Sequence, residues 1–71
     1  MELTLEKFAD DIYEIALLLN LGSPSLGLYQ QKYSGPLLDT IISKLYKRPF
    51  WNWRSCYTVA VEIYPLIHEC E

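Results

Sequence analysis

The sequence predicts an all-α fold, a small antiparallel bundle of three main helices and one short helix in a single domain spanning residues 1–71. Two observations support this prediction. Apolar residues recur at steps of three and four along most of the chain, which is the spacing of one helix face. The breaks between these runs hold glycine, proline and serine, which interrupt helices. The hydrophobic fraction of 51% argues against disorder in a chain of 71 residues.

The first main helix is predicted over residues 5–21. Its buried stripe consists of apolar side chains spaced along one helix face: Leu5, Phe8, Ile12, Ile15, Ala16 and Leu19. Thr4 suits an N-cap, and Gly22 suits a left-handed end. Because Leu17 and Leu18 lie beyond this stripe, we expect the helix to be buried on more than one side, against neighbouring helices or against a partner.

The short helix is predicted over residues 25–33 and the second main helix over residues 36–48. Ser23-Pro24 has the character of a helix start, and Pro36 suits the first position of the following helix. We expect Pro49 to end the second main helix, because proline cannot continue it. The buried face of this helix is predicted from its apolar spacing: Leu37, Leu38, Ile41, Ile42 and Leu45.

The third main helix is predicted over residues 52–64, with Asn52 as its N-cap. Residues 56–64 also alternate like a strand and include β-branched side chains, which favour strands. Length decides for the helix, because the helical pattern covers the whole segment and a lone strand would have no partner. We expect Pro65 to end or kink this helix, since proline removes a backbone donor.

The residues with reactive side chains lack the spacing that catalysis or metal binding needs. His68 and Cys70 lie two residues apart, which suits neither one helix face nor the paired ligand clusters of structural zinc sites. Asp10, Asp11 and Glu14 are more simply a solvated acidic face than a pair of catalytic carboxylates. The sequence therefore predicts a non-enzymatic protein with no catalytic residue, no metal, no cofactor and no small-molecule substrate.

The chain shows no targeting or membrane segment. Its opening, MELTLEKFADD, has neither a basic region nor an apolar run, and the longest stretch without polar residues, 15–19, is too short to cross a bilayer. Cys56 and Cys70 do not form a disulfide framework. We expect a cytoplasmic protein with reduced thiols and no membrane partner, and the opening methionine favours a whole protein over an excised domain.

Opposite charges are concentrated in two stretches of this chain, whose net charge is −3. The first segment is acidic, and residues 44–54, KLYKRPFWNWR, interleave cations with aromatic rings. Trp, Tyr and Arg dominate the energetics of protein interfaces. We therefore expect a helical interaction module, acting as an adaptor, an inhibitor or a self-associating domain. It would bind a protein partner or its own copies through ten residues: Asp10, Asp11, Glu14, Leu17, Leu18, Lys47, Arg48, Trp51, Trp53 and Arg54.

Two alternatives remain at this point. The basic and aromatic stretch 44–54 also has the composition that stacks bases and holds phosphates, which predicts a nucleic-acid or nucleoprotein binder using Lys44, Lys47, Arg48, Trp51, Trp53 and Arg54. The acidic overall charge makes this second function less favoured. The acidic and basic surfaces can also meet either between copies, as in a self-associating protein, or within one molecule.

Overall fold

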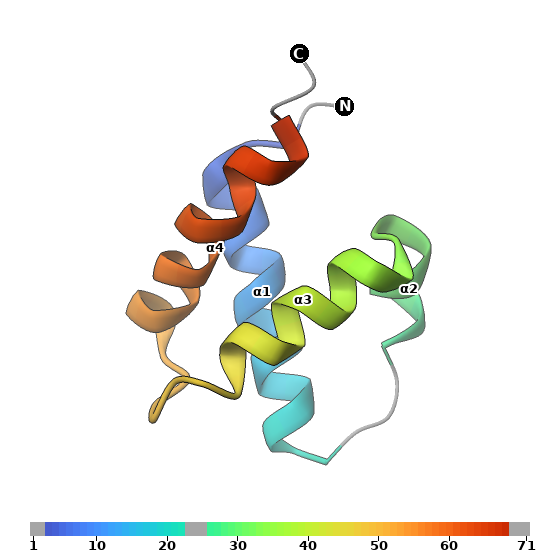
Figure 1. The fold of residues 1–71 in the computed structure, drawn as a ribbon. Coiled ribbons are helices and arrows are strands. Elements are labelled where there is room, and N and C mark those ends of the chain that lie inside the picture. The colour runs from blue at the N-terminus through green and yellow to red at the C-terminus, as the bar shows by residue number, and fades with distance from the viewer. Residues whose placement is uncertain (1–2, 23–25, 69–71) are drawn as a thin grey trace.

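The computed structural model describes residues 3–22 and 26–68, and within these ranges the chain forms four α-helices (Figure 1). They are α1 (Leu5–Asn20), α2 (Gly27–Lys32), α3 (Gly35–Leu45) and α4 (Trp53–His68). The predicted all-α class is confirmed, and residues 56–64 are helical rather than extended. The start predicted at Ser23-Pro24 lies outside the described residues.

α1 and α4 form the main antiparallel pair, and α3 crosses this pair obliquely with the short α2 beside it (Figure 1). The Tyr64 hydroxyl donates a hydrogen bond to the carbonyl oxygen of Leu3 over 2.8 Å, which ties the end of α4 to the segment before α1. At the opposite end of the pair, the last turn of α1 lies near the loop that joins α3 to α4 (Figure 1). The two ends of the bundle therefore differ: one holds the first and last described residues, and the other holds this loop.

The core is formed by apolar side chains of α1, α3 and α4 with no solvent exposure: Phe8, Ala9, Ile12, Ile15, Ile41, Leu45, Cys56, Val59, Ala60 and Ile63. Burying a large apolar side chain stabilises a fold by about 1.5–3 kcal/mol, so these contacts hold the three longer helices together. The predicted stripes are confirmed in their central positions. Four predicted members of these stripes are only partly buried: Leu5, Leu19, Leu37 and Ile42. Ala9 and Val59 join the core without having been predicted.

Local signals at the helix ends agree with the sequence. Thr4, Ser34 and Asn52 each accept a hydrogen bond from a backbone N–H three residues ahead, which satisfies a donor that the first helical turn leaves free. After α1, Gly22 adopts a φ of 74°, the left-handed conformation that glycine reaches without steric cost. α3 begins at Gly35, so Pro36 occupies its second position rather than the predicted first.

α3 ends at Leu45, three residues before the predicted end at residue 48. The residue before a proline avoids the helical conformation, and here that residue is Arg48. The chain leaves the helix through tight turns, in which Lys47 and Arg48 donate backbone hydrogen bonds to carbonyl oxygens three residues back. The two cations consequently lie in the loop and not on the last turn of α3.

α4 continues through Pro65 to His68, so the predicted end at residue 64 was wrong, and of the two expected effects of Pro65 only a kink remains as a prediction. A proline inside a helix leaves the carbonyl oxygen four residues earlier without its usual donor, and here that residue is Val61. Val61 is exposed, so water can reach this part of the helix and satisfy the oxygen. The energetic cost of the proline is therefore reduced by its position on the solvent side of α4.

Candidate functional site

The side chain of Trp51 ties the loop between α3 and α4 back to the last residue of α3. The indole Nε1 of Trp51 donates a hydrogen bond to the carbonyl oxygen of Leu45 over 2.7 Å, and the backbone N–H of Arg48 donates to the same oxygen over 2.9 Å. The ring of Tyr46 meets Trp51 edge-on at a centroid distance of 5.2 Å. Two donors and one ring contact thus fold the loop back onto the last turn of α3.

The loop is fixed at its other end by Ser55. Its hydroxyl donates to the carbonyl oxygen of Phe50 over 2.7 Å and accepts from the backbone N–H of Asn52 over 3.0 Å. In return, the backbone N–H of Ser55 donates to Oδ1 of Asn52 over 2.9 Å. This reciprocal arrangement resembles a capping box. Phe50 is consequently presented from a loop held at both ends, with 73% of its surface exposed.

An open pocket of about 370 Å³ lies between this loop and the last turns of α1. We call it the end pocket. α1 contributes Ala16, Leu17 and Asn20 to its lining, and the loop contributes Tyr46, Arg48, Pro49, Phe50 and Trp51. The volume is near the lower limit of the roughly 300–1,000 Å³ typical of ligand pockets. The end pocket therefore has the size for an anchoring side chain rather than for a large cofactor.

Large apolar side chains surround the end pocket without being covered. Leu17 is 44% exposed and Tyr46 is 65% exposed, and both line the pocket together with Phe50. Leu21, 78% exposed, follows Leu17 by one helical turn and extends the apolar surface beyond the pocket rim. Contiguous exposed apolar surface of this kind marks interaction sites on small proteins.

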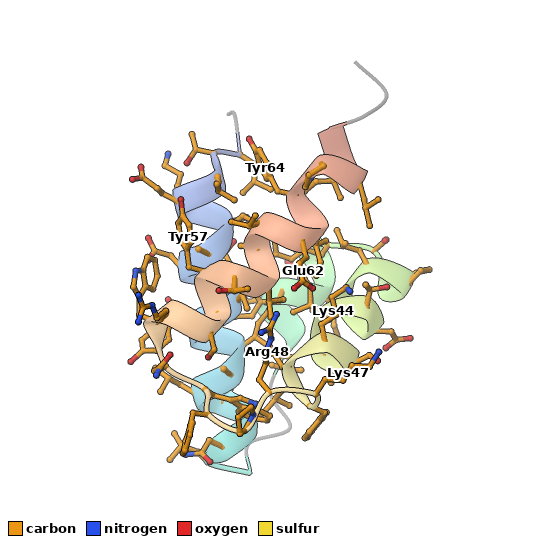
Figure 2. The ribbon with its side chains drawn as sticks, turned by 60° about the vertical axis from the view of Figure 1, so that its left-hand side comes forward. Lys44, Lys47, Arg48, Tyr57, Glu62 and Tyr64 are labelled. Carbon is orange, nitrogen blue, oxygen red and sulfur yellow. The ribbon has the colours of Figure 1, made fainter. Side chains whose placement is uncertain are left out.

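Glu62 of α4 binds two of the cations in the basic stretch. Its Oε2 lies 2.6 Å from a guanidinium nitrogen of Arg48, and its Oε1 lies 3.3 Å from Nζ of Lys44. Figure 2 shows both cations directed towards Glu62, whereas Lys47 lies away from it at the end of α3. These contacts place the Arg48 side chain between the end pocket and α4, where it also lines the pocket.

A second hollow, of about 260 Å³, continues the end pocket on the α4 side of the loop. The two hollows share Arg48, Pro49 and Phe50, and the second one adds Arg54 from the first turn of α4. The side chains of Arg54 and Lys47 have no ion-pair partner among residues 3–22 and 26–67. The loop thus lies between two neighbouring hollows, and the exposed ring of Phe50 and the side chain of Arg48 line both of them.

The acidic residues of α1 have a different role in the fold. The Asp11 carboxylate accepts hydrogen bonds from the Tyr33 hydroxyl and from Nζ of Lys32, the latter over 2.7 Å. Glu14 accepts a hydrogen bond from the Tyr29 hydroxyl over 2.9 Å. Both carboxylates therefore tie α2 and the residue that follows it to α1. Asp10, the third predicted acidic residue, is exposed to solvent.

These contacts perturb the two phenols. Burial, followed by the hydrogen bond to the Glu14 carboxylate, raises the pKa of Tyr29 from 10.0 to about 12. Burial and the hydrogen bond to Asp11 also raise the pKa of Tyr33. A phenolate beside either carboxylate would place two negative charges together in a partly desolvated position. Both tyrosines consequently act as neutral hydrogen-bond donors that attach α2.

The acidic and basic stretches predicted from the sequence do not pair with each other in the described part of the chain. The carboxylate of Asp11 binds Lys32, and the two cations Lys44 and Arg48 bind Glu62. Neither Lys32 nor Glu62 belonged to the predicted charged surfaces. Within residues 3–22 and 26–67, the acidic stretch therefore forms its ion pair with Lys32, and the basic stretch forms its ion pairs with Glu62.

The predicted partner-binding residues are divided among several places. Leu17, Arg48 and Trp51 meet at the end pocket, whereas Leu18 is half-buried against the core. Trp53 belongs to another ring cluster, with Tyr13 at a centroid distance of 6.0 Å and Tyr57 at 6.1 Å.

Sequence reasoning did not include Tyr46 and Phe50 among the partner-binding residues, although both line the end pocket. The available signal was Pro49, which directly precedes Phe50 and lies three residues after Tyr46, since side chains near a helix stop leave the periodic buried face.

No set of three or more His, Cys, Asp or Glu side chains in the described part of the chain converges closely enough to hold a metal ion. The candidate ligands and nucleophiles His68 and Cys70 lie outside the described side chains. Burial raises the pKa of the Cys56 thiol, which is unpaired and fully enclosed in the core. This thiol is therefore placed as an apolar packing group rather than as a nucleophile.

No family model, no curated protein and no solved structure matches this chain. Among the described helices, none has the length and apolar character needed to span a bilayer.

Proposed function

We propose that this protein is a non-enzymatic helical interaction module that binds another protein through the end pocket. The observation that carries the proposal is the exposure of Leu17, Tyr46 and Phe50 around one pocket. Burial of this apolar surface against a partner would be favourable, because each large apolar side chain removed from water contributes about 1.5–3 kcal/mol.

The rigidity of the loop supports the same proposal. Binding costs free energy when loops and side chains must be ordered at an interface. Here the hydrogen bond from Trp51 and the contacts of Ser55 have already ordered the loop that carries Phe50. A partner therefore meets a preformed surface with an aromatic anchor near its centre, which is the composition of an interface hot spot.

As part of this proposal, the protein acts in the cytoplasm as an adaptor or inhibitor. The unpaired and buried Cys56 supports a reducing compartment, because a disulfide-stabilised secreted domain of this size would place its cysteines in bridges. Cell fractionation with an antibody against the folded protein tests the location: recovery in the soluble cytosolic fraction is expected, and recovery with secreted proteins contradicts it.

The binding proposal is tested by affinity capture with matched variants. Phe50→Ser removes the exposed anchor, and Leu28→Ser removes an equally exposed leucine, 72% accessible, on α2. We expect proteins captured by the unaltered chain to be lost with Phe50→Ser and retained with Leu28→Ser. Equal capture by both variants contradicts binding at the end pocket.

Light scattering over a concentration series separates a different partner from a second copy of the chain. We expect a mass of one chain, 8.3 kDa, at all concentrations. A concentration-dependent increase in mass that Leu17→Glu abolishes would instead assign the end pocket to self-association, because a carboxylate at this exposed position opposes an apolar contact.

A further inference from the structure

The charge around the two hollows indicates which kind of partner fits them. Their lining residues include Arg48 and Arg54 and no carboxylate, whereas the chain as a whole has a net charge of −3. The positive charge is therefore a local property of this surface and not a general property of the protein. A surface of one sign attracts and orients partners of the opposite sign.

The ion pairs leave positive charge unbalanced at this end of the molecule. Glu62 is one carboxylate shared by Lys44 and Arg48, so one of these two charges is not neutralised. Arg54 and Lys47 add two more cations with no ion-pair partner among the described residues. Asp39 and Lys47 line a separate hollow without forming an ion pair.

The position of Arg54 strengthens the excess of positive charge. It lies in the first turn of α4, and this turn contains no acidic residue. The N-terminal end of a helix has a partial positive charge, so that end normally favours Asp or Glu and disfavours a cation. Arg54 therefore adds its charge to that of the helix end, beside a hollow that Phe50 also lines. A carboxylate bound there would be stabilised by both.

We propose that the two hollows bind an acidic peptide segment with a large apolar side chain, which rests on the proposed function as a protein-interaction module. The apolar side chain occupies the end pocket beside Leu17 and Phe50. Carboxylates before or after it pair with Arg54 and compete with Glu62 for Arg48. The apolar anchor supplies affinity, and the surrounding charges supply selectivity and attraction over distance.

The number of available cations favours an acidic peptide over a nucleic acid. The chain has six Lys and Arg residues, and three of them, Lys32, Lys44 and Arg48, are engaged in ion pairs. Lys7 lies in the first turn of α1, at the end of the molecule away from the loop (Figure 1). Affinity for nucleic acid comes largely from cations that neutralise phosphates, and a protein with a strongly salt-dependent affinity makes about 6–10 such contacts. The free cations at this surface instead match a few carboxylates.

The test is selection from a phage library of random short peptides on the immobilised full chain. The enriched peptides are then made synthetically and titrated by fluorescence anisotropy. We expect them to carry Asp or Glu beside an aromatic residue or leucine. We expect Kd to rise about tenfold with Arg54→Glu and about thirtyfold with Phe50→Ser, and to stay unchanged with Leu28→Ser. Circular dichroism spectra and Tm values confirm that each variant is folded, and Arg54→Gln, expected to show a smaller rise in Kd, serves if Arg54→Glu does not fold.

The outcomes distinguish this inference from the proposed function. Enriched peptides without acidic residues that still lose binding with Phe50→Ser overturn the acidic partner and leave the end pocket as a protein-binding site. Peptides unaffected by Phe50→Ser, or no enrichment, overturn the acidic-peptide inference, and equal protein capture by Phe50→Ser and Leu28→Ser overturns the proposed function as well. Tighter binding of a single-stranded oligothymidylate than of any peptide, with a steep loss of affinity as salt rises, overturns the inference in favour of nucleic acid.

Discussion

The carbonyl oxygen of Leu45 accepts the indole N–H of Trp51 over 2.7 Å, and this contact joins the last residue of α3 to the loop that forms the end pocket. The loop would otherwise be a seven-residue connection, residues 46–52, with exposed aromatic side chains. Because the indole fixes its path, the shape of the pocket depends on one side chain that is itself part of the pocket lining.

The substitution Trp51→Phe removes the indole N–H but keeps an aromatic ring, so it measures the contribution of the hydrogen bond apart from that of the ring contact. We expect Trp51→Phe to lower the free energy of unfolding by about 1 kcal/mol, near the value of one hydrogen bond, because Leu45 keeps the N–H of Arg48 as a donor. Urea denaturation followed by circular dichroism measures this. Trp53→Phe is the matched control, since Trp53 is 43% exposed, and its expected change is within about 0.5 kcal/mol. Equal losses in both variants would contradict the role of the indole N–H.

The two phenylalanines of the chain should respond in opposite ways to the same substitution. Phe8 is fully buried, and the centroid of its ring lies 5.7 Å from that of Tyr33. Phe50, in contrast, is 73% exposed. Phe8→Ala should cost about 3–5 kcal/mol, enough to unfold much of a marginally stable small domain. Phe50→Ala should change stability by less than about 0.5 kcal/mol while removing partner binding. A large loss of Tm with Phe50→Ala would falsify the assignment of this ring to function rather than to folding.

Removing the phenol hydroxyls should loosen α2 without opening the core. Tyr33→Phe leaves Asp11 with Lys32 as its hydrogen-bond donor, and Tyr29→Phe leaves Glu14 facing solvent. We expect each change to lower the free energy of unfolding by about 1–2 kcal/mol. Hydrogen exchange should increase in residues 26–33 and stay unchanged in α4. Unchanged exchange in residues 26–33 would mean that these hydrogen bonds do not hold α2.

The same two tyrosines predict how stability depends on alkaline pH. Their pKa values are raised in the folded chain, to about 12 for Tyr29, so folding favours the protonated phenols. This contribution is complete below the ordinary tyrosine pKa of 10.0 and is lost as pH rises from there towards the folded value. Each pKa unit corresponds to about 1.4 kcal/mol, and solvent screens the partly buried Tyr29–Glu14 contact, so the expected loss from Tyr29 is about 1–2 kcal/mol.

Denaturation at a series of pH values above neutrality, with absorbance of the phenolate as a second signal, measures this loss. The Tyr29→Phe, Tyr33→Phe double variant is the control, because it has neither group to ionise. Its stability should be lower at neutral pH and should fall less steeply above pH 10. Parallel curves for the double variant and the unaltered chain would show that other groups cause alkaline unfolding.

Neutralising Glu62 should strengthen binding of an acidic peptide. Glu62→Gln releases Arg48 and Lys44 from their shared carboxylate, which leaves more positive charge at the rim of the two hollows. Stability should fall by less than about 1 kcal/mol, because the side chain of Glu62 is 42% exposed and surface ion pairs contribute little. Anisotropy titration with an enriched peptide should show a lower Kd for the variant, and the difference in Kd between the variant and the unaltered chain should shrink at high salt. Weaker binding would show that Glu62 is needed to position Arg48.

The fold was predictable because local signals and burial agree. The apolar spacing of Phe8, Ile12 and Ile15 fixes one helix face, and the caps at Thr4 and Asn52 mark helix starts without reference to the rest of the chain. Two helix ends were wrong because they depend on context. α3 ends early where Arg48 must avoid the helical conformation before proline, and α4 passes Pro65 because that turn faces solvent.

The candidate site was predictable only in part, because tertiary contacts decide which polar groups stay free. The sequence predicts Asp11 and Glu14 as part of a solvated acidic face. In the structure they accept hydrogen bonds from phenols 22 and 15 positions away, which no local pattern reveals. Trp51 and Trp53 are two residues apart and join different ring clusters, because the first lies in the loop and the second begins α4. Residue composition indicated the region, and the fold selected the residues.

The hydrogen bond between Tyr64 and Leu3 has a practical consequence for attaching this protein to other things. Both ends of the described chain lie at the end of the bundle opposite the loop that joins α3 to α4 (Figure 1). This loop forms one side of the end pocket. At a rise of about 1.5 Å per residue, the 16 residues of α1 separate the two ends of the bundle by roughly 24 Å. A fluorophore, a biotin tether or a fused domain that continues from Leu3 or from His68 would therefore begin at the end of the bundle away from Phe50, so surface-based measurements can be made in both orientations and should give the same affinity.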